Sequence, residues 1–229
     1  MLFIAELGLN HNGNFDLVCE MMRQAKMAGA DIVKLQLGWR CKEGEINRID
    51  EAAMDKFFKY VDHLGIELMF SIISEEAFEL IKKYPVKRYK VASRTVKDNM
   101  DLVTRIVLEG KETIISLGMW DKPGQPIISF DGNVKYLWCK SKYPAYPWDM
   151  TDMPKNFMGS IYAGYSDHTL GIESALIAIS RGAEIIEKHF TLDKSDTTIR
   201  DHTLSATPDE FKQMVNLGRA IHRYVKAGV

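Results

Sequence analysis

The composition of this chain is that of a single globular domain. Its 229 residues are 46% hydrophobic and include no Pro/Gly/Ser-rich linker, so we predict one domain over residues 1–229. A formal net charge of −1 gives no electrostatic basis for binding nucleic acid or an anionic membrane, so neither is expected as a partner.

The cysteines and the apolar runs predict a cytoplasmic location. The three cysteines, Cys19, Cys41 and Cys139, are odd in number and widely spaced, which fits neither a disulfide framework nor a zinc knuckle. The N-terminal sequence shows no basic segment followed by a long apolar one. No run approaches the roughly 18 apolar residues that span a bilayer. We therefore expect neither export nor membrane insertion.

Short apolar runs of strand length alternate with amphipathic stretches of helical length along the chain. The predicted strands cover residues 3–9, 31–38, 67–73, 88–93, 112–118, 134–141, 160–166 and 184–191. The predicted helices cover residues 16–28, 50–64, 75–83, 98–109, 172–181 and 208–226. Eight strand units in 229 residues predict an α/β fold, a (β/α)8 TIM barrel slightly shorter than the usual length of about 250 residues.

One unit of the predicted barrel is irregular. Residues 120–126 contain two prolines and a glycine, which are incompatible with an ordinary helix, so we expect helix five to be a single turn or absent. An open doubly wound sheet is the competing architecture. It is disfavoured because no glycine-rich dinucleotide-binding turn follows the first strand.

Two histidines lie near the ends of the last two predicted strands, where barrel enzymes carry their active sites. Side-chain alternation places Ser166 on the same face as His168, and Glu187 on the same face as His189. Inward-pointing ionisable groups are costly to bury unless something pairs with them. A divalent metal held by two neutral imidazoles, together with a charged substrate, would supply the partner. By itself, a histidine at a strand end is more often a hydrogen-bonded structural residue.

Amine and hydroxyl groups at the other strand ends indicate a phosphate site. A compact set of such donors suits a dianionic phosphate. The donors are Lys90, Ser93, Ser116 and Ser166. Strand two adds Lys34 and Gln36 on one face. In isolation these serines would more often be turn or cap residues, and Lys34 could extend its amine to solvent. The whole set indicates a phosphorylated substrate and an electrophilic carbonyl.

Four motifs resemble those of the N-acetylneuraminate (sialic acid) synthase family, which includes the pseudaminic and legionaminic acid synthases. They are IAELGLNHNG at residues 4–13, AGADIVKLQ at 28–36, YSDHT at 165–169 and EKHFTLDK at 187–194. They occur in the family's order and span nearly the whole chain. The resemblance implies an enzyme that condenses phosphoenolpyruvate with the aldehyde of an open-chain N-acyl hexosamine and releases phosphate. It also implies a divalent metal, typically Mn²⁺.

The same resemblance implies roles for individual residues. The metal ligands would be His168 and His189. The phosphoenolpyruvate-binding residues would be Lys90, Ser93, Ser116 and Ser166. The residues facing the sugar or the reacting carbons would be Lys34, Gln36, Tyr143, Glu187 and Asp201, with Glu6 and Asn10 in the first motif. Of these, Glu187, Lys34 and Glu6 are the catalytic candidates. Glu187 would stabilise positive charge on carbon two of the former phosphoenolpyruvate or steer a proton.

The sequence departs from the family pattern in three places. Relatives commonly carry a carboxylate two residues after the strand-four serine, where this chain has Thr95 preceded by Arg94. The loop over residues 38–47 is shorter than usual. The sequence ends at Val229, whereas relatives continue into an antifreeze-like domain that supplies an arginine to a partner subunit's sugar site. Either another residue replaces that arginine, with Arg94 and Arg200 as the candidates, or the acceptor substrate differs. A homo-oligomer is compatible with this resemblance.

Two other functions stay open on the sequence alone. The barrel could act on a shorter or phosphorylated aldehyde, as another phosphoenolpyruvate-dependent or aldol-type enzyme. It could also be a non-catalytic relative that keeps a metal or phosphate site for binding. Retention of the complete set of phosphate-binding, metal-binding and catalytic candidates argues against lost catalysis. The acceptor sugar and its N-acyl group are not specified by the sequence.

Overall fold

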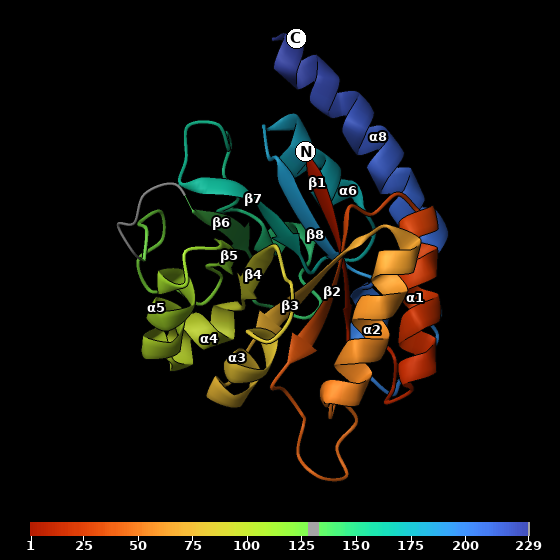
Figure 1. Cartoon of the computed structure of the whole chain (residues 1–229). Helices are drawn as coiled ribbons and strands as arrows, with labels where there is room; N and C mark the ends of the chain where they lie inside the picture. Colours follow the sequence, from red (N-terminus) through yellow and green to blue (C-terminus); the bar gives the residue numbers. More distant parts are fainter. Residues whose placement is uncertain (128–132, 229) are drawn as a thin grey trace.

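Eight parallel strands close into a barrel in the computed structural model, which describes residues 1–127 and 133–228 (Figure 1). The strands follow chain order around the barrel, and β1 pairs with β8 to close it. The strands are β1 (Leu2–Gly8), β2 (Ile32–Leu37), β3 (Glu67–Ile72), β4 (Arg88–Val91), β5 (Glu112–Ser116), β6 (Val134–Cys139), β7 (Tyr162–Asp167) and β8 (Ile185–His189). The predicted (β/α)8 barrel is confirmed.

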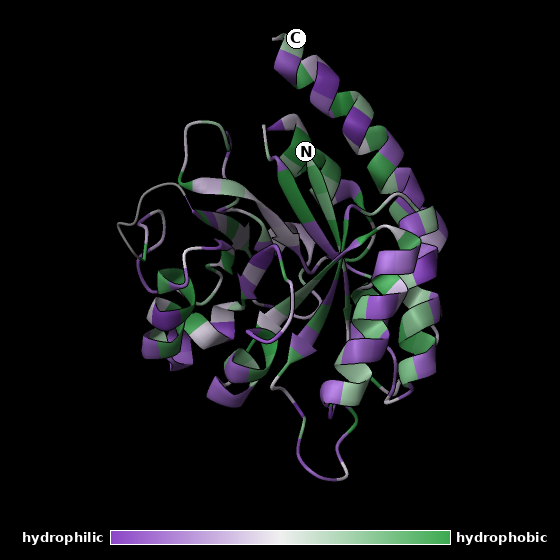
Figure 2. Cartoon of the chain, viewed as in Figure 1, coloured by the Kyte–Doolittle hydropathy of each residue, from purple (hydrophilic) through white to green (hydrophobic). Residues whose placement is uncertain are grey.

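Helices pack around the outside of the barrel (Figure 1). They are α1 (Phe15–Met27), α2 (Glu51–Leu64), α3 (Glu75–Ile81), α4 (Ser93–Asp98), α5 (Met100–Leu108), α6 (Glu173–Ser180), α7 (Asp201–Leu204) and α8 (Pro208–Ala227). In α1 the buried residues are Val18, Met21, Met22 and Ala25, a spacing of three and four residues that places them on one face. Figure 2 shows the same alternation of hydrophobic and hydrophilic residues along α1, α2 and α8.

Six of these helices, α1, α2, α3, α5, α6 and α8, were predicted, and α4 and α7 were missed. The helix α4 begins at Ser93, which we predicted to end strand four, and α7 lies in the segment after β8. A 3-10 turn, η1 (Pro147–Asp149), was also missed. Between β5 and β6, residues 117–127 and 133 contain no helix, in line with the two prolines, while residues 128–132 lie outside the described part.

The length and hydropathy of the helices decide whether any of them could cross a membrane. Within residues 1–127 and 133–228, none combines the length and the apolar character that a bilayer crossing requires.

The inward-facing side chains change from apolar to polar along the strands. One buried cluster inside the barrel consists of Ile4, Ile32, Met69, Ile114, Leu137 and Ile185. Two residues further along the same strands, and so on the same face, lie Glu6, Lys34, Ser71, Ser116, Cys139 and Glu187. The first layer closes the barrel with hydrocarbon, and the second presents polar groups at the C-terminal ends of the strands.

Gly164 allows β7 and β8 to approach closely, which brings Ser166 beside Glu187 across the pair. A Cβ atom at position 164 would lie 2.0 Å from the carbonyl oxygen of Ile185, which is backbone and cannot rotate away. We expect Gly164→Ala to lower the free energy of unfolding by about 2 to 3 kcal/mol, measured by denaturant titration. Gly159→Ala is the matched control, because its Cβ would meet only Asn156 at 4.0 Å. Equal stability of the two variants would contradict this account.

Candidate active site

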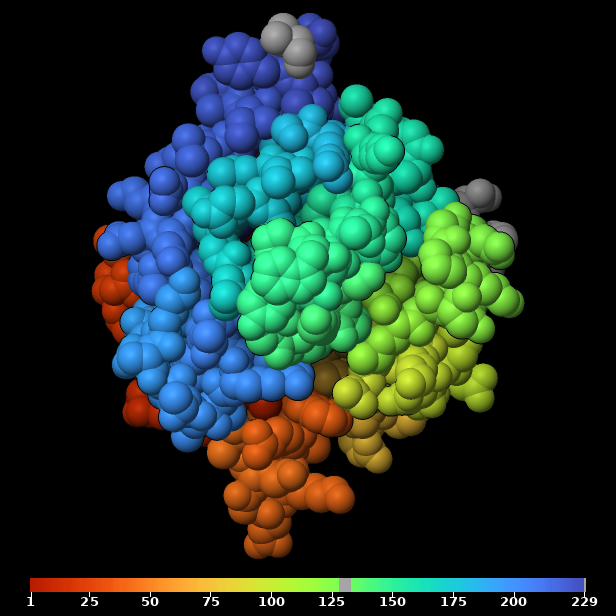
Figure 3. All heavy atoms as spheres, turned by 180° about the vertical axis from the view of Figure 1, so that it is seen from behind, coloured from red at the N-terminus to blue at the C-terminus, as the bar shows by residue number. Residues whose placement is uncertain are grey.

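A cavity of about 480 Å³ opens at the C-terminal ends of the strands. In Figure 3 recessed atoms from the region of β3 are visible between surface segments of the chain coloured orange, yellow, green and blue. Fourteen of the fifteen predicted site residues line this cavity: Glu6, Lys34, Gln36, Lys90, Ser93, Arg94, Ser116, Tyr143, Ser166, His168, Glu187, His189, Arg200 and Asp201. The barrel therefore brings together residues that are spread over almost the whole sequence.

A buried charge cluster forms the floor of the cavity. Lys34 pairs with Glu6 and lies 3.7 Å from Glu187 Oε2, and its Nζ donates to Ser71 Oγ at 2.8 Å. Lys90 Nζ approaches Glu187 Oε1 to 3.8 Å. All four charged side chains are almost completely buried. Unpaired charges at this depth would be strongly destabilising, so the residues stabilise one another.

The charge states of this cluster follow from burial and from its ion pairs. Burial raises the pKa of Glu187, but Lys34 and Lys90 outweigh it and lower the pKa to about 2. For Lys34, burial lowers the pKa, and the attraction of Glu187 and Glu6 more than compensates and raises it. Burial lowers the pKa of Lys90, with Glu187 opposing the shift. Burial raises the pKa of Glu6 despite Lys34. At neutral pH Glu187 is therefore an anion.

Lys90 and three serines form a group of donors on one side of the cavity. Lys90 Nζ donates to Ser116 Oγ at 2.8 Å, and Ser166 Oγ donates to Glu187 Oε1 at 2.8 Å. Ser93 Oγ accepts from the backbone N–H of Gly118 at 3.0 Å, at the start of α4. A phosphate oxygen could take up these hydroxyl and amine donors directly.

The two predicted metal ligands lie side by side at the C-terminal ends of the neighbouring strands β7 and β8, and both line the cavity. Their ring centroids lie 5.5 Å apart. His168 Nδ1 donates to the carbonyl of Lys140 at 2.9 Å, which leaves Nε2 with its lone pair. His189 Nδ1 is buried and has no hydrogen-bond partner within the described residues. Burial lowers the pKa of His168 to about 4, helped by His189, and burial lowers the pKa of His189 as well. Both rings are therefore neutral at pH 7.

Gly8 opens space beside this histidine pair. Its φ of +53° suits glycine, and a Cβ there would lie 3.7 Å from both His189 Nδ1 and Gln36 Nε2. Gln36 Nε2 in turn donates to Glu6 Oε1 at 3.2 Å. A side chain at position 8 would therefore lie directly against these polar groups.

Aromatic rings and arginines form the mouth of the cavity. The Tyr143 ring lies 4.3 Å from the His168 ring, and the Arg200 guanidinium lies 4.5 Å above Tyr143. Arg94 lies 5.5 Å from the Trp39 ring. Burial raises the pKa of Tyr143 well above its usual value, so its hydroxyl stays protonated. The two arginines are half or more exposed and are available to a substrate.

The structure gives the positions of three further residues named in the sequence analysis, and one of them lies outside the cavity. Asn10 does not line the cavity, because its amide donates to the carbonyl of Phe190 and to Ser205 Oγ, both at 2.9 Å. Asp201 lies in the helix α7, in the segment after β8, and lines the cavity. Thr95, which stands where relatives carry a carboxylate, is buried and donates to the carbonyl of Ile72 at 3.3 Å.

Sequence reasoning missed several residues that line the cavity. They include Trp39, Arg40, Ser71, Ser141, Thr198 and Ile199. Ser71 carried a usable signal, since it is a lone hydroxyl near the end of an otherwise apolar strand. Most of the others lie in loops, where no periodic pattern marks the direction of a side chain.

Two curated proteins are similar to this chain over nearly its whole length. The N-acetylneuraminate-9-phosphate synthase of Homo sapiens is 30% identical over 253 residues, covering 96% of this chain and 70% of that protein. The N,N'-diacetyllegionaminic acid synthase of Legionella pneumophila is 31% identical over 249 residues, covering 93% of this chain and 69% of that protein.

A solved structure and a family match extend the similarity to the fold. The crystal structure of N-acetylneuraminic acid synthetase from Leptospira borgpetersenii, in complex with citrate, superimposes with a TM-score of 0.82 at 26% identity. The superposition covers 98% of this chain and 84% of that chain. The NeuB family profile matches residues 41–229. The chain therefore belongs to the NeuB family.

Proposed function

We propose that this protein is a nonulosonic acid synthase, which condenses phosphoenolpyruvate with the aldehyde of an open-chain N-acyl hexosamine. A carbon–carbon bond forms between carbon three of phosphoenolpyruvate and the aldehyde carbon. Water adds at carbon two, the bond from that carbon to the phosphate oxygen breaks, and inorganic phosphate leaves. The observation that carries the proposal is the presence in one cavity of phosphate donors, two neutral imidazoles and an ionised carboxylate.

Phosphoenolpyruvate would bind at the side of the cavity formed by Lys90 and the three serines. The phosphate would take hydrogen bonds from Lys90 Nζ and from the hydroxyls of Ser116 and Ser93. These hydroxyls lie within a buried region, where a charge-assisted hydrogen bond is stronger than in water. The enol carbon would then point towards the histidine pair and the cavity mouth.

Glu187 and Lys34 would act on the reacting carbons. Positive charge develops on carbon two of the former phosphoenolpyruvate after the carbon–carbon bond forms, and the Glu187 anion is placed to stabilise it. Lys34 lies between Glu6 and Glu187 and donates at a fixed position because both carboxylates hold its amine. Lys34 would therefore supply a proton donor and Glu6 would orient it.

The histidine pair fits a divalent metal, and we propose Mn²⁺. Two neutral imidazoles face one cavity, and His189 Nδ1 has no hydrogen-bond partner within the described residues. Those residues contain no group of three or more His, Cys, Asp or Glu side chains in metal-binding geometry, so substrate or water would complete the coordination. When bound, the metal would polarise the aldehyde oxygen of the acceptor.

The test is phosphate release from phosphoenolpyruvate with Mn²⁺ and a panel of N-acyl hexosamines. The panel includes each sugar with and without a phosphate group, because Arg40, Arg94 and Arg200 line the cavity. Acceptor-dependent release of phosphate, with a product three carbons longer by mass spectrometry, would support the proposal. Phosphoenolpyruvate binding without turnover of any acceptor would favour the non-catalytic alternative.

Arg200 is the stronger of the two arginine candidates for holding the acceptor. Its guanidinium packs on Tyr143, which itself contacts the His168 ring, whereas Arg94 packs on Trp39. We expect Arg200→Ala to raise the KM for the acceptor about tenfold, the effect of losing one charged hydrogen bond. The KM for phosphoenolpyruvate should not change. Steady-state kinetics in both substrates measures this.

Arg223→Ala is the control for this prediction, because Arg223 lies on the exposed side of α8. It should leave both KM values unchanged. An acceptor KM that is unaffected by Arg200→Ala and raised by Arg94→Ala would assign the role to Arg94 instead.

A further inference from the structure

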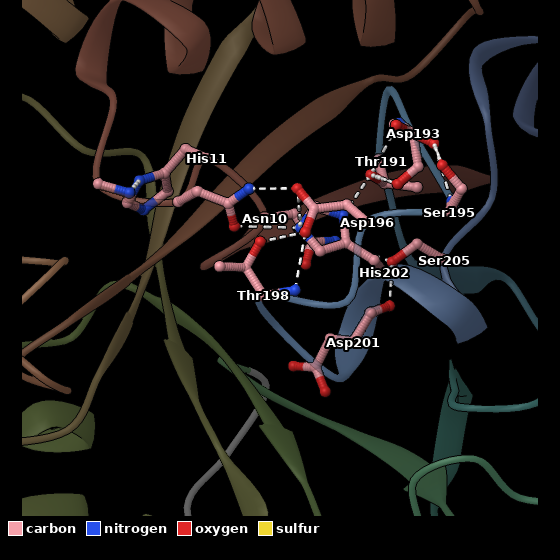
Figure 4. A network of polar contacts seen from close by, with 12 residues as sticks. Asn10, His11, Thr191, Asp193, Ser195, Asp196, Thr198, Asp201, His202 and Ser205 are labelled. Carbon is pink, nitrogen blue, oxygen red and sulfur yellow. Dashed lines mark hydrogen bonds and ion pairs between the residues drawn. The ribbon is translucent and has the colours of Figure 1, made fainter.

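A network of buried and half-buried polar groups connects the loop after β1 with the long segment after β8 (Figure 4). Asn12 Nδ2 donates to Asp196 Oδ2 at 2.5 Å, and Asn12 Oδ1 lies 3.1 Å from His202 Nε2. On its other side, His202 Nδ1 lies 2.7 Å from Thr191 Oγ1. We call Asn12, Thr191, Asp196 and His202 the loop latch.

The loop latch fixes one short segment at both of its ends. Residues 198–201 line the cavity and lie between Asp196 and His202 in the sequence. On one side, Asp196 Oδ1 accepts from the backbone N–H of Thr198 at 2.7 Å. On the other side, the N–H of His202 donates to the carbonyl of Ile199 at 3.2 Å. The hydrogen bonds of Asp196 and His202 therefore hold the two ends of the segment, and Asn12 contacts both of these residues.

A second chain of hydrogen bonds supports the same segment from behind. Asn10 Nδ2 donates to Ser205 Oγ at 2.9 Å, and Ser205 Oγ donates to the carbonyl of Asp201 at 2.6 Å. Figure 4 shows Asn10, Ser205 and Asp201 close to His202 and Asp196. The loop after β1 therefore supports the cavity wall at two points, although it lies about 190 residues away in the sequence.

We propose that the loop latch is a positioning device for the acceptor. This inference rests on the proposed function. Residues 198–201 carry Arg200 and Asp201 at the cavity mouth. The phosphate donors Lys90, Ser93 and Ser116 come from β4, α4 and β5, and their side-chain hydrogen bonds join them to one another, to Val91, to Cys139 and to Gly118, none of which belongs to the latch. Disturbing the latch therefore displaces the acceptor side of the cavity and leaves the phosphoenolpyruvate side in place. Misplacement of a binding group by about 1 Å is enough to reduce turnover strongly.

The Asn12–Asp196 pair allows an exchange experiment. Asn12→Asp places two carboxylates against each other, while aspartate tolerates the φ of 52° at this position. In the double variant Asn12→Asp with Asp196→Asn, the new amide donates to the new carboxylate, and the bond to His202 is kept. We expect the single variant to raise the acceptor KM about tenfold, with an unchanged phosphoenolpyruvate KM, and the double variant to return close to the parent value.

A matched control separates positioning from general stability. Asn14 lies in the same loop, but its side chain accepts from the N–H groups of Asp16 and Leu17 and caps α1. Asn14→Ala should lower the Tm by the loss of an N-cap and leave both KM values unchanged. Equal increases in both KM values for Asn12→Asp, or no rescue in the double variant, would overturn the proposal.

Amide hydrogen exchange over residues 196–204 tests the latch without any turnover. Exchange in this segment should be faster in Asn12→Asp than in the parent protein and should recover in the double variant. If the parent protein turns over no acceptor, the proposed function fails. The exchange rates in the variants still show whether the loop latch holds residues 196–204 in place. Unchanged exchange in Asn12→Asp would overturn the latch, whatever the outcome for activity.

Discussion

Replacing His189 with alanine is expected to abolish binding of the proposed divalent metal and to reduce activity by more than about 100-fold. Residues that merely support metal ligands cost 10- to 100-fold when removed, so loss of a ligand should exceed that range. The ring lies at the end of β8 and faces the cavity, with a buried nitrogen that lacks a hydrogen-bond partner within the described residues. Metal content after dialysis, measured by mass spectrometry, and phosphate release are the two readouts. His168→Ala should behave in the same way.

The barrel should remain folded in these variants, because both rings border the cavity and the apolar layer below them is untouched. Circular dichroism and thermal unfolding check this. His63→Ala is the matched control, since His63 lies exposed in the last turn of α2. A His189→Ala protein that keeps its metal and its activity would refute the assignment of the ligand pair.

Much of the fold was predictable because the strands repeat a simple pattern. In β1, β2 and β8, Ile4, Ile32 and Ile185 each precede a charged residue by two positions. Side-chain alternation places each isoleucine and the charged residue two positions later on the inner face of the barrel. The sequence therefore predicts a polar layer above an apolar one. The barrel is confirmed, and the resemblance to the sialic acid synthase family inferred from four motifs is confirmed as well.

The short helices and the loops were not predictable in the same way. The helix α4 has six residues, too few to show an apolar period, and it begins directly after β4. The direction of Asn10 depends on contact with Phe190 and Ser205, which are 180 and 195 residues away. Such contacts exist only after the barrel has closed, so the local sequence could not place Asn10 behind the cavity wall.

At the cavity mouth, the sequence identified the two arginines but not the residues on which they pack. Arg94 and Arg200 were chosen because each lies close to a predicted strand end, and both do line the cavity. Their aromatic partners, Trp39 and Tyr143, come from loops after β2 and β6. Only the folded structure shows which arginine packs next to the histidine pair.

Lys90→Ala is expected to weaken phosphoenolpyruvate binding about 10- to 150-fold, because a charge-assisted hydrogen bond to a phosphate contributes roughly 1.5 to 3 kcal/mol. The amine is 2% exposed and lies 2.8 Å from Ser116 Oγ and 3.8 Å from Glu187. Its loss also removes a cation that keeps Glu187 ionised, so the substitution changes both the phosphate site and the carboxylate beside it.

Isothermal titration with phosphoenolpyruvate, without acceptor, isolates the phosphate contribution from turnover. Lys111→Ala is the control, because Lys111 donates to the carbonyl of Val86 beyond the N-terminal end of β5, at the opposite end of the barrel. It should bind phosphoenolpyruvate as the parent protein does. Ser116→Ala should give a smaller loss than Lys90→Ala, since it removes a neutral donor and leaves the charge in place. Unchanged affinity in Lys90→Ala would exclude this side of the cavity as the phosphate site, and the phosphate would then have to bind among the arginines at the mouth.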